Sequence, residues 1–127
     1  MSMKTAAHLI ADAKGRIENL SPAAVAVELE DADVLLVDVR EAEERQMSIP
    51  GAIHAPRGML EFYADPTSAY HRVEFDPGRR TILYCASGGR SALAADMLRA
   101  LGHHRVAHLD GGLKAWQAAG LEIEPES

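Results

Sequence analysis

The sequence predicts an α/β protein with a central, mostly parallel sheet, and three observations support this fold class. Short apolar runs alternate along the chain with stretches of helical periodicity. Two of these runs, residues 34–37 (VLLV) and 81–84 (TILY), are β-prone and show no alternation of polar and apolar residues. Such runs are typical of strands that are covered on both faces of a sheet. Strands that alternate with helices indicate right-handed crossovers between parallel strands.

About five short strands are expected. The two continuous runs provide two of them, and residues 105–109 (RVAHL) provide a third. Residues 52–55 predict a shorter strand, and residues 17–20 predict a strand at the edge of the sheet.

Four helices are expected between these strands. Ser21 is a suitable N-cap with Pro22 at the first helical position, which predicts a helix that runs to about Leu29. The other three helices are expected at residues 5–13, at residues 89–101 and in a segment that ends at Gly120.

The apolar faces of these helices are predicted from spacing. Leu93, Met97 and Leu101 lie four residues apart, and Gly102 follows as the C-terminal stop. In the helix at residues 5–13, the corresponding face contains Leu9, Ile10 and Ala13, and Trp116 of the last helix is expected in the core.

Composition sets limits on function. The 127 residues suit one compact domain with a helical extension at residues 1–16, and the 47% hydrophobic content is ordinary for a globular protein. The net charge of −6 argues against nucleic acid or an acidic membrane surface as a partner. Charged residues interrupt the N-terminus and no run of 18 apolar residues occurs, so the expected location is the cytoplasm.

Metal binding is not expected, and neither is a cofactor. The single cysteine excludes an intrachain disulfide and a cysteine-rich zinc site. The six histidines have no ligand spacing. His103 and His104 are interpreted as an exposed turn, and His54 and His108 as hydrogen-bonded residues of the core.

The chemistry is expected at the carboxyl ends of the strands, where open parallel sheets bind ligands. Cys85 stands there and opens the loop Ala86, Ser87, Gly88, Gly89, Arg90, Ser91. The two glycines let successive N–H groups turn inward, and the following helix adds the positive end of its dipole. Arg90 adds a permanent cation, so we favour a reactive thiolate over a buried structural cysteine.

The spacing of the loop separates two kinds of anion chemistry. Protein phosphatases place a thiolate under backbone amides with Cys-x5-Arg spacing, whereas Arg90 comes one residue sooner after Cys85. Catalytic groups tolerate only small misplacement, so a phosphatase is disfavoured.

At this point the sequence resembles the rhodanese family in its single-domain form. The resemblance rests on the loop from Cys85 to Ser91 and on three further motifs in the same order: residues 37–41 (VDVRE), residues 49–54 (IPGAIH) and residues 109–116 (LDGGLKAW). It implies a three-layer α/β/α fold over residues 1–127.

The resemblance also implies a sulfur-transfer cycle without a metal or organic cofactor. The Cys85 thiolate would take the sulfane sulfur of a small anion such as thiosulfate and hold it as a persulfide. Cyanide, a thiol or an acceptor protein would then remove it. Arg90 would be catalytic with Cys85, and the rest of the loop would bind the donor.

Three other residues are candidates with smaller roles. Asp38 and Arg40 stand at a strand end, and the resemblance implies that they brace the active loop. Arg40 and Glu44, four residues apart, are expected to form a surface ion pair. Arg57 opens a long connection, residues 56–79, and could lend a second positive charge to a pocket that this connection walls.

One further function and one further class of sulfur donor stay open. The chain could be a sulfur carrier or regulatory binding domain with little turnover, because one fold hosts both. Polysulfide or a protein persulfide could replace thiosulfate as the donor, because Ala86 and Ser87 bring no charge to the loop.

Overall fold

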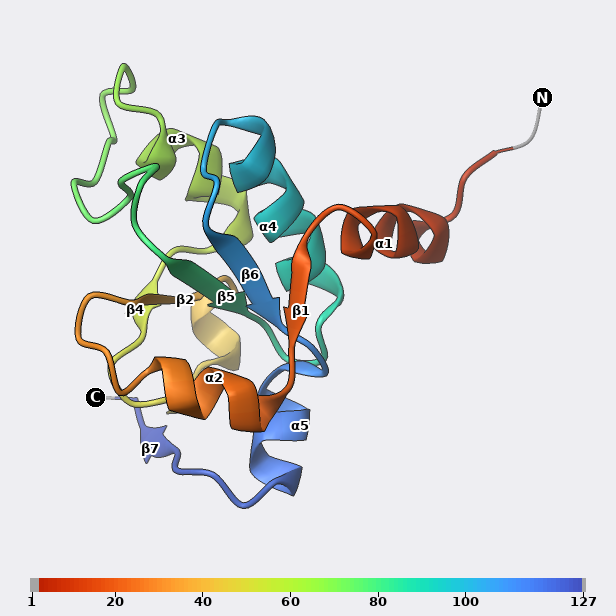
Figure 1. Ribbon diagram of the computed structural model, residues 1–127, viewed down its shortest axis with the longest axis vertical. Helices are drawn as coiled ribbons and strands as arrows, with labels where there is room; N and C mark the ends of the chain where they lie inside the picture. The colour runs from red at the N-terminus through yellow and green to blue at the C-terminus, as the bar shows by residue number, and fades with distance from the viewer. Residues whose placement is uncertain (1–2, 127) are drawn as a thin grey trace.

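Five parallel strands form the central sheet of the computed structural model, which describes residues 3–126 (Figure 1). Their order across the sheet is β1-β6-β5-β2-β4. The strands are β1 (Glu18–Leu20), β2 (Leu35–Asp38), β4 (Ile53–His54), β5 (Thr81–Tyr84) and β6 (Val106–Leu109). The expected strands are therefore confirmed to within two residues at each end, including β1 at the sheet edge.

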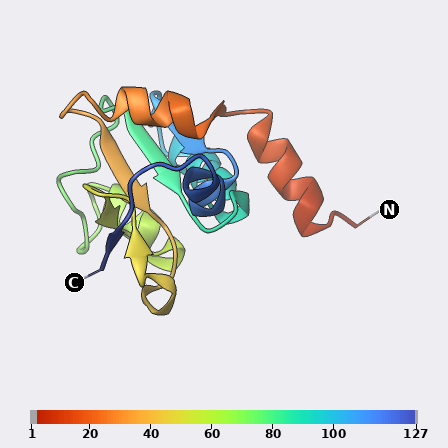
Figure 2. The same cartoon turned by 90° about the horizontal axis from the view of Figure 1, so that it is seen from below.

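Helices cover both faces of the sheet, which confirms the three-layer arrangement. α3 (Leu60–Ala64) and α4 (Gly89–Ala100) pack on one face, and α2 (Pro22–Glu28) and α5 (Gly112–Ala118) pack on the other (Figures 1 and 2). Successive side chains of β5 point alternately toward the two helical layers, because side chains alternate along a strand. Leu83 faces α4, whereas Ile82 and Tyr84 face α5.

The first helix lies to one side of this body. α1 (Ala6–Lys14) projects from the domain in both views and contacts α4 (Figures 1 and 2). Thr5 caps it by accepting a hydrogen bond from the His8 N–H, while Ala13 is fully buried. Leu9, expected on the apolar face, is 47% exposed.

Several short elements complete the chain. β3 (Met47–Ser48) and β7 (Glu124–Pro125) form a separate antiparallel pair that the sequence did not predict. Two single turns of 3-10 helix, η1 (Ala42–Glu44) and η2 (Arg57–Met59), follow the ends of β2 and β4. Within residues 3–126, no helix is both long enough and apolar enough to cross a bilayer.

The prediction of the buried face of α4 is wrong. Ala92, Ala94, Ala95 and Leu98 are buried, whereas Leu101 is 44% exposed. Alanine side chains let α4 approach the sheet closely. The prediction chose the face with the large apolar residues, because it used hydrophobic spacing alone.

The prediction for the turn after α4 is also wrong in part. His103 is only 2% exposed, and its Nδ1 has no hydrogen-bond partner among the described residues. The chain turns inward here because the His103 N–H donates to the carbonyl of Leu98. His104 is exposed, as expected.

Candidate active site

Cys85 follows β5 directly, at the carboxyl end of the sheet, and is 1% exposed. Two backbone N–H groups donate to its sulfur: that of Gly88 at 3.1 Å and that of Ser91 at 3.4 Å. Donors of this kind stabilise negative charge on the atom they face. The predicted juxtaposition of the cysteine with its loop amides is therefore present.

The loop can fold this way because of Gly88. This residue has φ +104° and directly precedes α4. A Cβ at this position would lie 3.1 Å from the Gly111 nitrogen. Both the positive φ and the close approach favour glycine. Gly89 lies on the side of α1, since a Cβ there would lie 3.1 Å from Cδ1 of Ile10.

The start of α5 supports the loop from the opposite side. The N–H of Leu113 donates to the Cys85 carbonyl at 2.9 Å, and the N–H of Lys114 donates to the Ala86 carbonyl at 3.0 Å. Gly112, with φ +63°, makes this possible, because a Cβ there would lie 2.6 Å from the Cys85 carbonyl oxygen. This contact gives a physical reason for the second glycine of the 109–116 motif.

Arg90 is held by a carboxylate that the sequence did not assign to it. Its guanidinium donates two hydrogen bonds to Glu44, at 2.7 and 2.8 Å. These bonds, together with the hydrogen bond from the Glu41 N–H, lower the pKa of Glu44 to about 2. The bonds to Glu44 also raise the pKa of Arg90. The expected side-chain pair between Arg40 and Glu44 is wrong, because Arg40 turns inward.

Arg40 instead belongs to a buried cluster around Asp38. The Asp38 carboxylate accepts hydrogen bonds from the side chains of Arg40, Arg45 and Tyr84. Burial raises the pKa of Asp38, but the hydrogen bonds from Arg40 and Arg45 outweigh it and lower the pKa overall. The Tyr84 hydroxyl also accepts the Ile49 N–H, so this cluster anchors the residue that precedes Cys85.

The connection at residues 56–79 places part of its aromatic side chains in the core and leaves others exposed. Phe75 is 2% exposed and packs with Tyr63 and Cys85 in the cluster beneath α4. Phe62 and Tyr70 form an exposed edge-to-face pair. Arg57 is paired with Glu61 at 2.8 Å. Its position at the carboxyl end of β4 places it on the same edge of the sheet as the Cys85 loop.

The Ser91 side chain lies beneath the sulfur. Its Oγ is 3.5 Å from the Cys85 sulfur and 2.9 Å from Nδ1 of His108, which is fully buried on β6. The interpretation of His108 as a hydrogen-bonded residue of the core is confirmed. Its contact with Ser91 was not expected.

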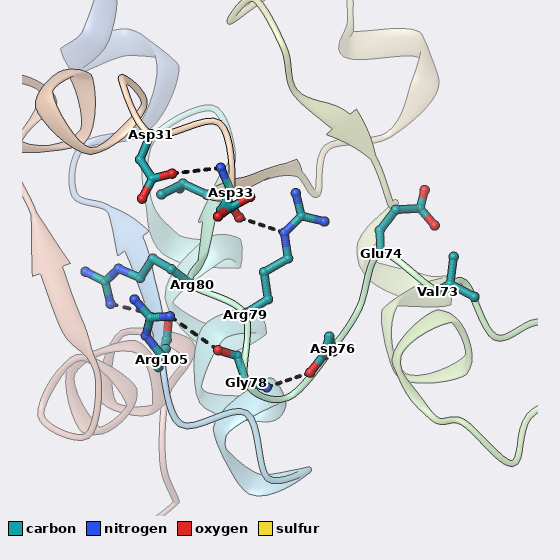
Figure 3. Close-up of a pocket in the computed structure, with 10 residues that line it drawn as sticks. Asp31, Asp33, Val73, Glu74, Asp76, Gly78, Arg79, Arg80 and Arg105 are labelled. Atoms are coloured by element: carbon teal, nitrogen blue, oxygen red, sulfur yellow. Dashed lines mark hydrogen bonds between the residues drawn. The ribbon is translucent and has the colours of Figure 1, made fainter.

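The largest hollow described lies at the other end of the sheet, where β2, β5 and β6 begin (Figure 3). It has a volume of about 560 Å³ and walls of both charges. Its arginines are already engaged: Arg79 donates to the Asp33 carbonyl, and Arg105 to the Gly78 carbonyl. No cysteine, serine or histidine lines this hollow.

Among residues 3–126, no group of three or more histidine, cysteine, aspartate or glutamate side chains is placed to hold an ion.

Asn19 also belongs to this site, because its Oδ1 lies 2.9 Å from Nε2 of His108. Sequence reasoning missed four residues of the site: Glu44, Arg45, Asn19 and His108 as a partner of Ser91. Glu44 and Arg45 had a signal, because they follow the VDVRE motif within a few residues. For Asn19 and His108 the sequence held no signal, since only the pairing of β1 with β6 brings them together.

Known proteins resemble this chain in sequence and in fold. The model of the Rhodanese-like domain family matches residues 21–119. A sulfurtransferase of Allochromatium vinosum is 38% identical over 92 residues, which cover 72% of this chain and 78% of that protein.

Two solved structures are similar over nearly the whole chain. One is a protein of unknown function from Rhodopseudomonas palustris, described as a possible tyrosine phosphatase; its TM-score is 0.90 at 39% identity, covering 98% of this chain and 97% of that chain. The other is the polysulfide-sulfur transferase homodimer of Wolinella succinogenes, with a TM-score of 0.73 at 29% identity, covering 93% of this chain and 85% of that chain.

Proposed function

This chain belongs to the rhodanese-like domain family of sulfurtransferases, and on that basis we propose that it moves a sulfane sulfur through a persulfide on Cys85. The donor is a small sulfur-containing anion such as thiosulfate. The acceptor is a thiol, cyanide or an acceptor protein. The observation that carries the proposal is the pair of N–H groups that converge on the Cys85 sulfur.

The proposed cycle has two steps. In the first, the Cys85 thiolate attacks the sulfane sulfur of thiosulfate; the S–S bond of the donor breaks, and sulfite leaves with the electron pair. In the second, a nucleophile attacks the outer sulfur of the persulfide, and the electron pair of that S–S bond returns to Cys85 as thiolate. Backbone donors that favour negative charge on the Cys85 sulfur stabilise the thiolate that attacks in the first step and the thiolate that is released in the second.

Arg90 and Arg57 are the proposed contacts of the donor oxygens. Arg90 can bind them only by sharing or exchanging its partner, because both of its terminal nitrogens donate to Glu44. Arg57 donates to Glu61 through one terminal nitrogen, Nη1, at 2.8 Å. This arrangement weakens the case for a strongly charged donor, and it supports polysulfide or a persulfide as the alternative to thiosulfate.

Steady-state kinetics test the proposal. With thiosulfate and cyanide as substrates, the two-step cycle predicts ping-pong behaviour, seen as parallel lines in double-reciprocal plots of thiocyanate formation. Cys85→Ser must abolish the reaction. Intersecting lines, or activity that survives in Cys85→Ser, would refute a persulfide intermediate.

A sulfur carrier is the alternative within the same family. The burial of the sulfur is consistent with slow discharge to small acceptors. Rapid persulfide formation with slow discharge to every small acceptor would identify a carrier.

A phosphatase is the second alternative, because the structure from Rhodopseudomonas palustris carries that suggestion in its description. The loop argues against it, since only four residues separate Cys85 from Arg90 and the Arg90 fork is bound to Glu44. Release of phosphate from an aryl phosphate, lost in Cys85→Ser, would revive it.

A further inference from the structure

A chain of hydrogen bonds runs behind the Cys85 sulfur, and the cycle proposed above makes no use of it. The sulfur lies 3.5 Å from Ser91 Oγ, and Ser91 Oγ lies 2.9 Å from Nδ1 of His108. On the far side of the ring, Nε2 of His108 lies 2.9 Å from Oδ1 of Asn19. Cys85, Ser91 and His108 are all buried, so protein groups set the direction of these bonds.

Asn19 fixes the tautomer of His108. The Asn19 Nδ2 donates to the carbonyls of Lys14 and Ile17, at 2.9 and 3.3 Å, so its Oδ1 must face the ring. Nε2 of His108 therefore carries the proton, and Nδ1 is an acceptor. Burial lowers the pKa of His108 to about 4, so the ring is neutral at neutral pH.

This tautomer decides what Ser91 offers to Cys85. A hydroxyl has one proton to donate, and His108 Nδ1 is its nearer acceptor, at 2.9 Å against 3.3 Å for the Gly88 carbonyl. With the proton committed to His108, a lone pair of Ser91 Oγ faces the sulfur. That lone pair can accept a hydrogen bond from the S–H of the Cys85 thiol, but it repels a negative charge on the Cys85 sulfur.

The persulfide is not subject to this repulsion. Its charge lies on the outer sulfur, and the inner sulfur next to Ser91 has none. Discharge of the persulfide brings the repulsion back, because the electron pair of the broken S–S bond returns to the inner sulfur and makes it a thiolate.

We propose that His108 is a positioning residue: by holding the Ser91 proton, it disfavours the free Cys85 thiolate relative to the thiol and the persulfide. The part that concerns the persulfide rests on the proposed function. The consequence is that the protein retains its sulfur until a strong acceptor arrives.

The other charged groups near Cys85 and His108 are the same in wild type and in the His108 variants. Arg90 acts on Cys85 and is neutralised by Glu44. Lys14 and Asp110 act on His108 with opposite signs and are themselves paired at 3.0 Å. Substitution of His108 leaves all four in place.

The test is the rate at which iodoacetamide alkylates Cys85 between pH 5.5 and 9, because the thiolate is the reacting form. His108→Leu removes the acceptor and frees the Ser91 proton for the sulfur. We expect its alkylation rate at pH 6.5 to rise about tenfold, the effect of one hydrogen bond to a charged group. His108→Asn offers an amide oxygen near the place of Nδ1, and its rate should stay within about twofold of wild type.

Ser91→Ala completes a double-mutant cycle. In that background His108→Leu should change the alkylation rate by less than about twofold, because no hydroxyl remains to be redirected. His108→Met, of similar volume, replaces His108→Leu if the latter does not fold by circular dichroism. Alkylation in 8 M urea must be equal for all variants, which controls for intrinsic reactivity.

Two results would overturn the proposal: an unchanged or slower rate in His108→Leu, or the same increase without the Ser91 hydroxyl. The assay uses no sulfur donor, so it is independent of the sulfurtransferase cycle. A chain that gives the expected alkylation rates but never takes up sulfur would refute the proposed function alone.

Discussion

Arg90 and Glu44 form a bidentate ion pair beside the Cys85 loop, with N–O distances of 2.7 and 2.8 Å. The Glu44 carboxylate is also fixed by the Glu41 N–H at 2.8 Å. The cation expected to receive the donor therefore already has an anionic partner, and an anionic donor competes with that partner.

Replacement of Glu44 tests this competition. Glu44→Gln keeps the shape and removes the charge, so we expect the KM for thiosulfate to fall about fivefold, the effect of removing one unit charge at ~4 Å in water. The turnover number should change little. Glu43→Gln is the matched control, because it removes the same charge from an exposed neighbour. A rise in KM would show that Glu44 is needed to hold Arg90 in place.

Arg57→Ala tests the second proposed cation. If Arg57 contacts the donor, the KM for thiosulfate rises severalfold while the fold is unchanged, because Arg57 lies in the short turn η2 and its partly exposed pair with Glu61 contributes little to stability. Glu61→Gln controls for loss of that pair. An unchanged KM in Arg57→Ala would remove Arg57 from the site.

Gly112→Ala should displace the active loop. Its φ of +63° strains any other residue, and its Cβ would lie 2.6 Å from the Cys85 carbonyl oxygen. We expect loss of most sulfur-transfer activity together with lower stability. Gly102→Ala is the control: its φ is +100°, but its Cβ would meet no described atom within 4 Å. That change should cost only the backbone strain, about 1 to 3 kcal/mol, and leave activity intact.

Asp38→Asn should destabilise the fold more than it alters chemistry. It leaves Arg40 and Arg45 buried without their common carboxylate, and removal of one partner of a buried pair costs about 3 to 5 kcal/mol. Urea unfolding measures the loss. Asp33→Asn, at an exposed site, is the control. Full stability with lost activity would instead make Asp38 catalytic.

The stability of the fold should fall as the pH drops from 6.5 toward 4. Burial lowers the pKa of His108 to about 4 in the folded state, from 6.5 in the unfolded chain, so the unfolded state binds the proton first. Stability is complete above pH 6.5, and on the order of 3 kcal/mol is lost by pH 4. His108→Asn should remove this part of the difference in unfolding free energy between pH 7 and pH 5.

His103 contributes in the same direction, because burial lowers its pKa too, and its share should persist in His108→Asn. His104→Asn, at an exposed site, should keep the full pH dependence. An identical pH dependence in His108→Asn and wild type would contradict the account.

Much of the fold could be predicted because local signals agree with tertiary needs. Continuous apolar runs correspond to β2 and β5, and Ser21 with Pro22 marks the start of α2. The position of the Cys85 loop also follows from sequence, since the strand end, the glycines and the following helix are contiguous in the chain.

The remaining features depend on contacts between distant residues. Nothing local pairs Arg90 with Glu44 or Ser91 with His108. The alanine face of α4 was not predicted. Close packing against the sheet requires small side chains on that face, whereas a prediction from hydrophobic periodicity favours the most hydrophobic residues. The short β3–β7 pair was missed because two residues per strand carry no pattern.

The most direct test of the central claim is intact-protein mass spectrometry before and after treatment with thiosulfate, or with polysulfide, followed by cyanide. The account predicts that wild type gains the mass of one sulfur atom, that cyanide removes it with release of thiocyanate, and that Cys85→Ser gains none. If neither donor adds sulfur to the wild-type chain, or if Cys85→Ser gains it equally, the persulfide on Cys85 is contradicted.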